Sequence, residues 1–194
     1  MSNPLGDIEI TDPQVMRALA HPVRMAILTQ LRWRGPATAT ELSPHVGATP
    51  SVASWHLRQL AGCGLVQDAE PGPDRRQRRW EAVAKGFRFE LGGEGEAGDA
   101  ARGLALQMFL DVADLPQRWL TEVEPQLPPE WRRLGGLAHT RVALTPEELE
   151  QLGAAVEQLL APYVTRAEQE RPAGAQLVRL MRYVLPELPE GEDA

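Results

Sequence analysis

Residues 49–66, TPSVASWHLRQLAGCGLV, contain the signals of one short helix and of the turns at both of its ends. Thr49 before Pro50 is typical of a helix N-terminus, because threonine caps the first turn and proline suits the first helical position. The glycines of the GCG run that follows are typical of a helix C-terminus. The sequence therefore predicts a helix from about Pro50 to Ala61.

The two faces of this helix differ in a way that suggests what it contacts. At 3.6 residues per turn the apolar face comprises Ala53, Leu57 and Leu60, with His56 at its margin. The opposite face carries hydroxyls, an amide, a guanidinium and one indole ring, on Ser51, Ser54, Trp55, Arg58 and Gln59. Such groups match those that contact phosphates and base edges in a DNA groove. The alternative is an ordinary surface helix, since one exposed tryptophan needs no explanation by itself.

The segment before this helix predicts a helix-turn-helix. Residues 40–46 indicate a short helix capped by Thr40, and residues 47–49 form a tight turn that contains a glycine. Further upstream, Asp12 and Pro22 mark the starts of two more helices.

The segment after this helix predicts a β-hairpin with a basic tip. Residues 65–70 and 79–83 have strand character, and the PGPD run at 71–74 is typical of a turn. Four arginines lie beside that turn, namely Arg75, Arg76, Arg78 and Arg79. A phosphate backbone would relieve their mutual repulsion, which favours DNA contact over the alternative of a disordered solvated loop.

The order of two helices, a recognition helix and a hairpin resembles the winged helix-turn-helix of the ArsR family of bacterial transcriptional repressors. Four stretches carry the resemblance and cover about residues 12–90: LAHPVRMAIL from Leu19, TELSPHVGATPS from Thr40, the SxHLxxL pattern from Ser54, and GLVQ followed by the arginine-rich hairpin. The resemblance implies that the third stretch enters the DNA major groove and that the hairpin is the wing.

On these grounds we predict a set of DNA-binding residues that comprises Thr49, Ser51, Ser54, Trp55, His56, Arg58, Gln59, Arg75, Arg76 and Arg78. His56 matches a family histidine at the edge of the recognition helix, and a half-buried structural side chain is an equally good interpretation of it. The chain departs from the family in its metal ligands. Many ArsR-type repressors sense metals through paired cysteines or His and Asp clusters, whereas Cys63 and four scattered histidines form no such set. We therefore expect no metal site and no cofactor.

The formal net charge of −7 argues against DNA binding at first sight, but the distribution of charge reverses that conclusion. Residues 12–91 contain eleven basic and seven acidic side chains and carry +4, whereas residues 92–194 contain nine and eighteen and carry −9. The GGEGEAGD run at 92–99 is typical of a linker. We therefore predict a DNA-binding domain at 12–91, a linker at 92–99, and an acidic C-terminal domain at 100–194 that faces away from the duplex.

The C-terminal domain mixes helical and strand signals. Residues 104–123 predict a long apolar helix bent at Pro116, residues 137–144 a strand, and residues 145–170 a capped helix. Periodicity leaves residues 176–184 open between helix and strand. The sequences RVALTPEELEQL and QLVRLMRYVLPEL resemble a C-terminal extension of some ArsR-like regulators, in which two strands flank a helix, and this favours a strand. The predicted fold class is mainly α with small β (α+β): an N-terminal winged helix-turn-helix plus a C-terminal α/β dimerisation or sensing domain.

Several other classes of protein are disfavoured. Hydrophobic residues make up 43% of the chain, which suffices for a core, yet no apolar run approaches a membrane span. The first twelve residues lack the features of a secretion signal, so we expect a cytoplasmic protein with no membrane partner. We also expect no enzyme. No GxSxG, GxxxxGK[ST] or HExxH spacing occurs, and no nucleophile is paired with a base among His21, His45, His56, His139 and Cys63.

The sequence thus predicts a sequence-specific transcriptional regulator that binds double-stranded DNA. We expect it to be a homodimeric repressor that responds to a non-metal signal. The apolar surplus of residues 104–123 predicts the dimer interface, with the N-terminal helix as a second contributor. A small-molecule effector pocket is one interpretation of the aromatic and Met side chains of this region, although such residues more often form core; they are Met108, Phe109, Trp119 and Trp131. The alternative function is a winged-helix protein-interaction module without DNA binding, which the arginine wing disfavours.

Overall fold

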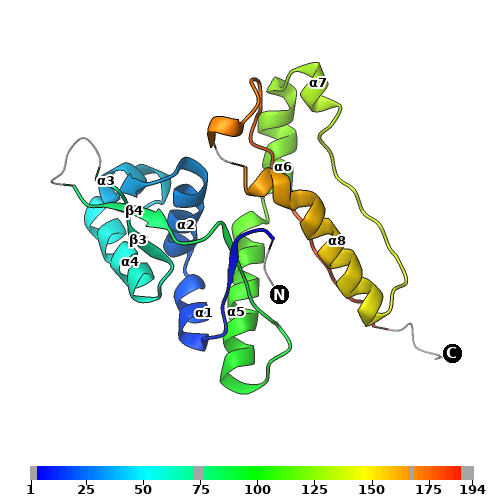
Figure 1. Ribbon diagram of the computed structural model, residues 1–194, viewed down its shortest axis with the longest axis horizontal. Helices are drawn as coiled ribbons and strands as arrows, with labels where there is room; N and C mark the ends of the chain where they lie inside the picture. The colour runs from blue at the N-terminus through cyan, green and yellow to red at the C-terminus, as the bar shows by residue number, and fades with distance from the viewer. Residues whose placement is uncertain (1–3, 72–76, 167, 189–194) are drawn as a thin grey trace.

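The computed structural model describes residues 4–71, 77–166 and 168–188. Its N-terminal part is built from four short helices and a small sheet. The helices are α1 (Pro13–Leu19), α2 (Pro22–Arg34), α3 (Ala39–Leu42) and α4 (Pro50–Gly62), and a 3-10 turn, η1 (Ser43–His45), follows α3. The sheet has the order β2-β4-β3 and is antiparallel, with strands β2 (Ala37–Thr38), β3 (Val66–Asp68) and β4 (Arg79–Ala82). This is a winged helix-turn-helix, and with the mainly helical remainder of the chain it confirms the predicted α+β class (Figure 1).

Local capping explains where most of these helices begin. The Asp12 side chain accepts a hydrogen bond from Gln14 N at 2.8 Å, and Thr49 accepts one from Val52 N, as the sequence predicted for α1 and α4. The predicted cap of α3 is wrong, because the helix begins two residues earlier than expected. Thr38 is its cap and forms a reciprocal pair with Glu41, with Thr38 N donating to Oε2 at 2.7 Å and Glu41 N donating to Oγ1 at 3.2 Å.

The core lies between the helices and the sheet and extends further along the chain than predicted. It joins Met16 and Leu19 of α1 and Trp80 of β4 to Ala101 and Leu104 of the next helix, α5 (Gly95–Val112). Residues 95–99 of the expected linker therefore belong to a helix. The prediction was wrong there because the small residues of this segment let α5 approach α1 closely, and packing outweighs the flexibility of its glycines.

A second, two-stranded sheet connects the N-terminal segment to the exit of the wing. Strand β1 (Asp7–Glu9) pairs in parallel with β5 (Gly86–Arg88), so that Asp7 lies opposite Gly86. Neither strand was predicted as such, since each is only three residues long and the partners are far apart in sequence.

The C-terminal half is helical but loosely packed. The elements after α5 are α6 (Leu115–Arg118), the π-helical η2 (Trp119–Val123), η3 (Glu124–Gln126), α7 (Pro129–Arg132), α8 (Pro146–Val164) and η4 (Glu168–Glu170). The predicted bend at Pro116 is confirmed, because α5 ends at Val112 and a new helix starts at Leu115. Figure 1 shows α8 set apart from the winged part, with α5 and α6 between them. Within the described ranges, no helix is both long and apolar enough to cross a membrane.

Three C-terminal predictions need correction. The strand expected at 137–144 is not formed, and residues 176–184 are neither strand nor helix. Both segments have strand-like sequences, but a β-strand forms only when a partner strand takes up the hydrogen bonds of its backbone. Among the described residues, neither segment has such a partner strand. Helix α8 ends at Val164 rather than near residue 170, two residues after Pro162.

Candidate nucleic-acid interface

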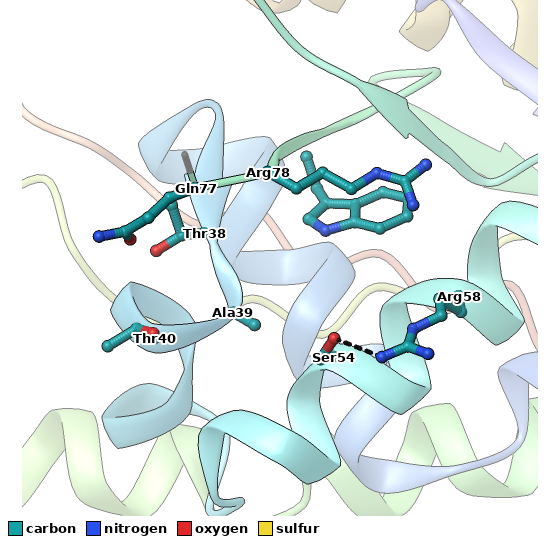
Figure 2. A pocket seen from close by; sticks show the side chains of 8 residues that line it. Thr38, Ala39, Thr40, Ser54, Arg58, Gln77 and Arg78 are labelled. Atoms are coloured by element: carbon teal, nitrogen blue, oxygen red, sulfur yellow. Dashed lines mark hydrogen bonds between the residues drawn. The ribbon is translucent and has the colours of Figure 1, made fainter. Parts of the chain in front are cut away.

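A hollow of about 420 Å³ separates the recognition helix α4 from the wing. Figure 2 shows Ser54 and Arg58 of α4 on one side of it, and Gln77 and Arg78, just before β4, on the other. In the described part of the chain, the residues that line it are Thr38, Ala39, Thr40, Ser54, Arg58, Gln77, Arg78 and Trp80. The hollow therefore combines two guanidinium groups with hydroxyl and amide groups, a set suited to binding phosphate oxygens and base edges of DNA.

On the α4 side, Ser54 holds Arg58 in place. Arg58 Nη2 donates a hydrogen bond to Ser54 Oγ at 3.1 Å, one helical turn away (Figure 2). This bond uses one of the five N–H donors of the guanidinium, so the remaining donors are available to a ligand. The serine thus orients the arginine without neutralising its charge.

On the wing side, Arg78 is held by two neighbours. Its guanidinium lies 3.9 Å from the ring centroid of Trp80, which is 3% exposed, and Nη2 pairs with Asp68 Oδ2 at 3.0 Å. The hydrogen bond from Arg78 lowers the pKa of the Asp68 carboxyl, and the same bond raises the pKa of Arg78. Arg78 therefore stays charged, and its position is fixed by the buried indole beneath it.

The adjacent arginine turns the other way. Arg79 donates a hydrogen bond to the backbone carbonyl of Pro36 and pairs with Glu41 at 3.5 Å, and its side chain is only 24% exposed. Arg79 thus ties β4 to α3 and takes no part in the hollow. Of the other residues at the predicted basic tip, Arg75, Arg76 and residues 72–74 of the turn lie outside the described residues.

The outer face of α4 matches the face predicted from its sequence. The side chain of Trp55 is 52% exposed, and Thr49, Ser51, Arg58 and Gln59 are exposed as well. Ser54 is half-buried at the rim of the hollow. The indole of Trp55 lies edge-on to the His56 ring, with the two centroids 4.8 Å apart. A flat, exposed ring therefore stands beside the polar groups of the same face.

His56 does not belong to this exposed face, so its inclusion among the DNA-contacting residues is corrected. Its side chain is 4% exposed, because position 56 lies on the same side of α4 as Ala53 and Leu60. Its ring lies against that of His21, with centroids 4.6 Å apart, and His56 Nδ1 has no hydrogen-bond partner among the described residues. His21 in turn caps α2, since its Nδ1 accepts a hydrogen bond from Val23 N at 3.2 Å. Burial lowers the pKa of both histidines, and Arg24 lowers both further.

Sequence reasoning missed the residues that other elements bring to the hollow, namely Thr38, Thr40, Gln77 and Trp80. The run of hydroxyl side chains at the start of α3 is the one signal that could have pointed to them. A second hollow lies behind the wing and is lined by Arg32 and Lys85 among others, and the described lining of neither hollow includes Phe109 or Trp119 of the expected effector pocket. Within the described residues, no three metal-ligating side chains gather in one place.

Comparison with known proteins supports the assignment of the N-terminal part. Residues 19–67 match the family model described as a helix-turn-helix domain. A 51-residue segment is 47% identical to the HTH-type transcriptional regulator NmtR of Mycobacterium tuberculosis; it covers 26% of this chain and 42% of that protein. The match thus spans less than half of the relative's length. Residues 19–67 form a helix-turn-helix domain, in agreement with the observed α2 to β3 arrangement.

Similarity to solved structures is weak over the whole chain. The YusO protein from Bacillus subtilis is 14% identical, with a TM-score of 0.32 and coverage of 76% of this chain and 83% of that one. The MarR family regulator NMB1585 from Neisseria meningitidis is 17% identical, with a TM-score of 0.32 and coverage of 73% and 79%.

Proposed function

We propose that this protein is a sequence-specific DNA-binding transcriptional regulator in which α4 enters the major groove. One observation carries the proposal: the exposed face of α4 presents Trp55 and Arg58, and Arg78 of the wing stands across a hollow from it. A helix with polar and planar side chains fits the major groove, and a second cation nearby fits the adjacent phosphate backbone. The name of the relative, a transcriptional regulator, agrees with this function.

The residues divide into two roles. Ser51, Ser54, Trp55, Arg58 and Gln59 face the base edges, where an arginine gives bidentate contacts to guanine and a glutamine to adenine. Thr49, at the N-terminus of α4, and Arg78 face the phosphates, which set the register of the helix but carry no sequence information.

The distribution of charge supports this orientation. The segment 12–91 carries +4 and the remainder after it −9, although the whole chain is acidic. The basic segment is attracted to the duplex, and the acidic half is repelled by it. The protein therefore approaches DNA with α4 and the wing foremost.

The proposed active form is a homodimer that acts as a repressor. One recognition helix contacts few base pairs, and two copies related by a two-fold axis read two inverted half-sites. The signal that changes its affinity is one other than a metal ion, and DNA binding needs no cofactor.

Selection of binding sites from a random library of duplex DNA by the purified full-length protein tests this proposal. We expect enrichment of an inverted repeat whose half-sites are centred about one helical turn apart. Failure to enrich any sequence, with the protein folded, would overturn the proposal. Capture of a protein but no duplex would instead support the protein-interaction module.

A further inference from the structure

We infer that a second copy of this chain covers the apolar surface of the C-terminal half, and that the extended segments 137–144 and 176–185 form strand pairs with that copy. The inference rests on the dimer of the proposed function and names the surface that would form it. We define the C-terminal apolar surface by six exposed side chains. Leu106 and Leu110 belong to α5, Leu159 and Tyr163 to α8, Leu137 to segment 137–144 and Leu180 to segment 176–185.

The first argument is the total area that the chain exposes. Its accessible surface is 14258 Å². A compact monomer of 21.4 kDa exposes about 9,100 Å², so this chain exposes about 5,000 Å² more than one compact protein of its size. Each subunit of an obligate homodimer buries about 1,000 to 2,500 Å². The excess is therefore large enough to supply a full interface of that kind.

The second argument is where the excess lies. Leu104 is the last buried residue of the described chain, and none of the nineteen residues of α8 is buried. Leu159 and Tyr163 of α8 are 72% and 69% exposed, and Leu180 is 71% exposed. The first half of α5 is already packed against α1 within one chain, so that part of α5 is not available to a partner. The available apolar surface begins with the second half of α5.

The third argument is the backbone of the two extended segments. Among the described residues, no backbone hydrogen bond joins either segment to another part of the chain. Their sequences, LAHTRVAL and QLVRLMRYVL, include Thr, Val and Tyr, which favour strands, and contain no proline or glycine. Unpaired extended backbone of this kind recruits a strand from another molecule.

The charges on this surface favour a second copy over other occupants. Helix α8 contains no basic side chain and four acidic ones, of which Glu157 pairs with Arg88 of β5 and the other three are exposed. Segment 176–185 contains Arg179 and Arg182 and no acid. In a two-fold arrangement, the basic segment of each copy meets the acidic helix of the other. An anionic membrane would be repelled by α8. The ion pair of Arg141 with Glu187 and the contact of the Phe109 and Tyr183 rings, 5.4 Å apart, hold the segments in place to receive the partner.

Hydrogen exchange and sedimentation of the full-length protein without DNA test the inference. At a concentration where sedimentation gives a dimer, the amides of 137–144 and 176–185 should exchange about tenfold or more slowly than at a dilution that gives a monomer. Rapid exchange in the dimer would overturn the strand pairing, and so would slow exchange in a monomer. A chain that stays monomeric at high micromolar concentration would overturn the whole inference.

A matched pair of variants locates the interface. Leu180→Asp should raise the dimer dissociation constant about tenfold or more, because it places a charge in the interface. Leu91→Asp changes a leucine that is 53% exposed but lies outside the C-terminal apolar surface, and it should leave that constant unchanged. Equal effects of the two variants would contradict the inference. Affinity for a single half-site is measured separately on the monomeric Leu180→Asp protein and tests DNA binding, the proposed function. The dimer surface can therefore be wrong while DNA binding holds, and the reverse.

Discussion

The guanidinium of Arg78 lies over the buried indole of Trp80, 3.9 Å from the ring centroid. Asp68 holds the same group from the neighbouring strand at 3.0 Å. The cation on the wing is therefore fixed by a rigid ring and a carboxylate before any ligand arrives. A phosphate that replaces Asp68 as the partner would find the arginine already oriented, which lowers the entropic cost of binding.

Replacement of Arg78 tests the role of the wing. Arg78→Ala should weaken binding to selected and random DNA by the same factor and reduce the slope of log affinity against log salt by about one unit, because one phosphate contact is lost. Binding by fluorescence anisotropy across a salt series measures both quantities. Arg102→Ala is the control, since that arginine pairs with Asp99 on α5, away from the hollow. An unchanged salt slope in Arg78→Ala would contradict the assignment.

Trp55 should contribute to DNA binding with little contribution to stability. Trp55→Ala removes an indole that is 52% exposed, so we expect the free energy of unfolding to change by about 1 kcal/mol or less while affinity for the selected site falls. Trp33→Ala is the matched control. Trp33 is 48% exposed and contacts Arg179 instead of lying on α4. A large fall in melting temperature with unchanged DNA affinity would make Trp55 a packing residue.

The cap of α3 can be checked by two single substitutions. Thr38→Ala should lower the free energy of unfolding by about 1 kcal/mol, because it leaves the Glu41 amide without its acceptor. Thr40→Ala, at the position expected from sequence to be the cap, should cost clearly less, since Thr40 is exposed and already inside the helix. Chemical denaturation of the two variants compares them directly, and the reverse order would refute the assigned cap.

Stability should depend on pH through His21 and His56. Burial and the nearby Arg24 lower the pKa of both, so the folded protein binds fewer protons than the unfolded chain just below pH 6.5, the approximate ordinary value. Stability is therefore retained above pH 6.5 and decreases as the pH falls below it. His21→Asn keeps an acceptor for the α2 cap and should flatten the decrease in melting temperature between about pH 7 and pH 5.5. The same pH dependence in wild type and variant would rule out this histidine pair as its source.

The N-terminal part was predictable because its signals are local. Thr49, Pro50 and the apolar spacing of α4 lie within one short segment, and they define both the start of the helix and its exposed face. The wing was predictable in outline but not in detail. Arg78 and Arg79 are neighbours in an extended chain, so their side chains point to opposite sides, and only Arg78 lines the hollow.

The rest depended on contacts that a single sequence does not reveal. Residues 92–99 have the composition of a linker, yet α5 starts at Gly95 because Ala100 and Ala101 pack into the core beside α1. His56 was placed at the margin of the apolar face, and the approach of His21 from another helix buries it. Residues 137–144 have a strand pattern without a strand partner among the described residues. A pattern predicts the preference of a segment, whereas its partner decides the outcome.

The ratio of affinities for the selected duplex and for random duplex tests most directly whether α4 reads DNA sequence. We predict a ratio of about 10³ or more for the wild-type protein at physiological salt. We also predict that the double variant Ser54→Ala/Arg58→Ala, with its melting temperature preserved, loses most of this ratio while it retains affinity for random DNA. A wild-type ratio near one, or a ratio that the double variant leaves unchanged, would contradict the account.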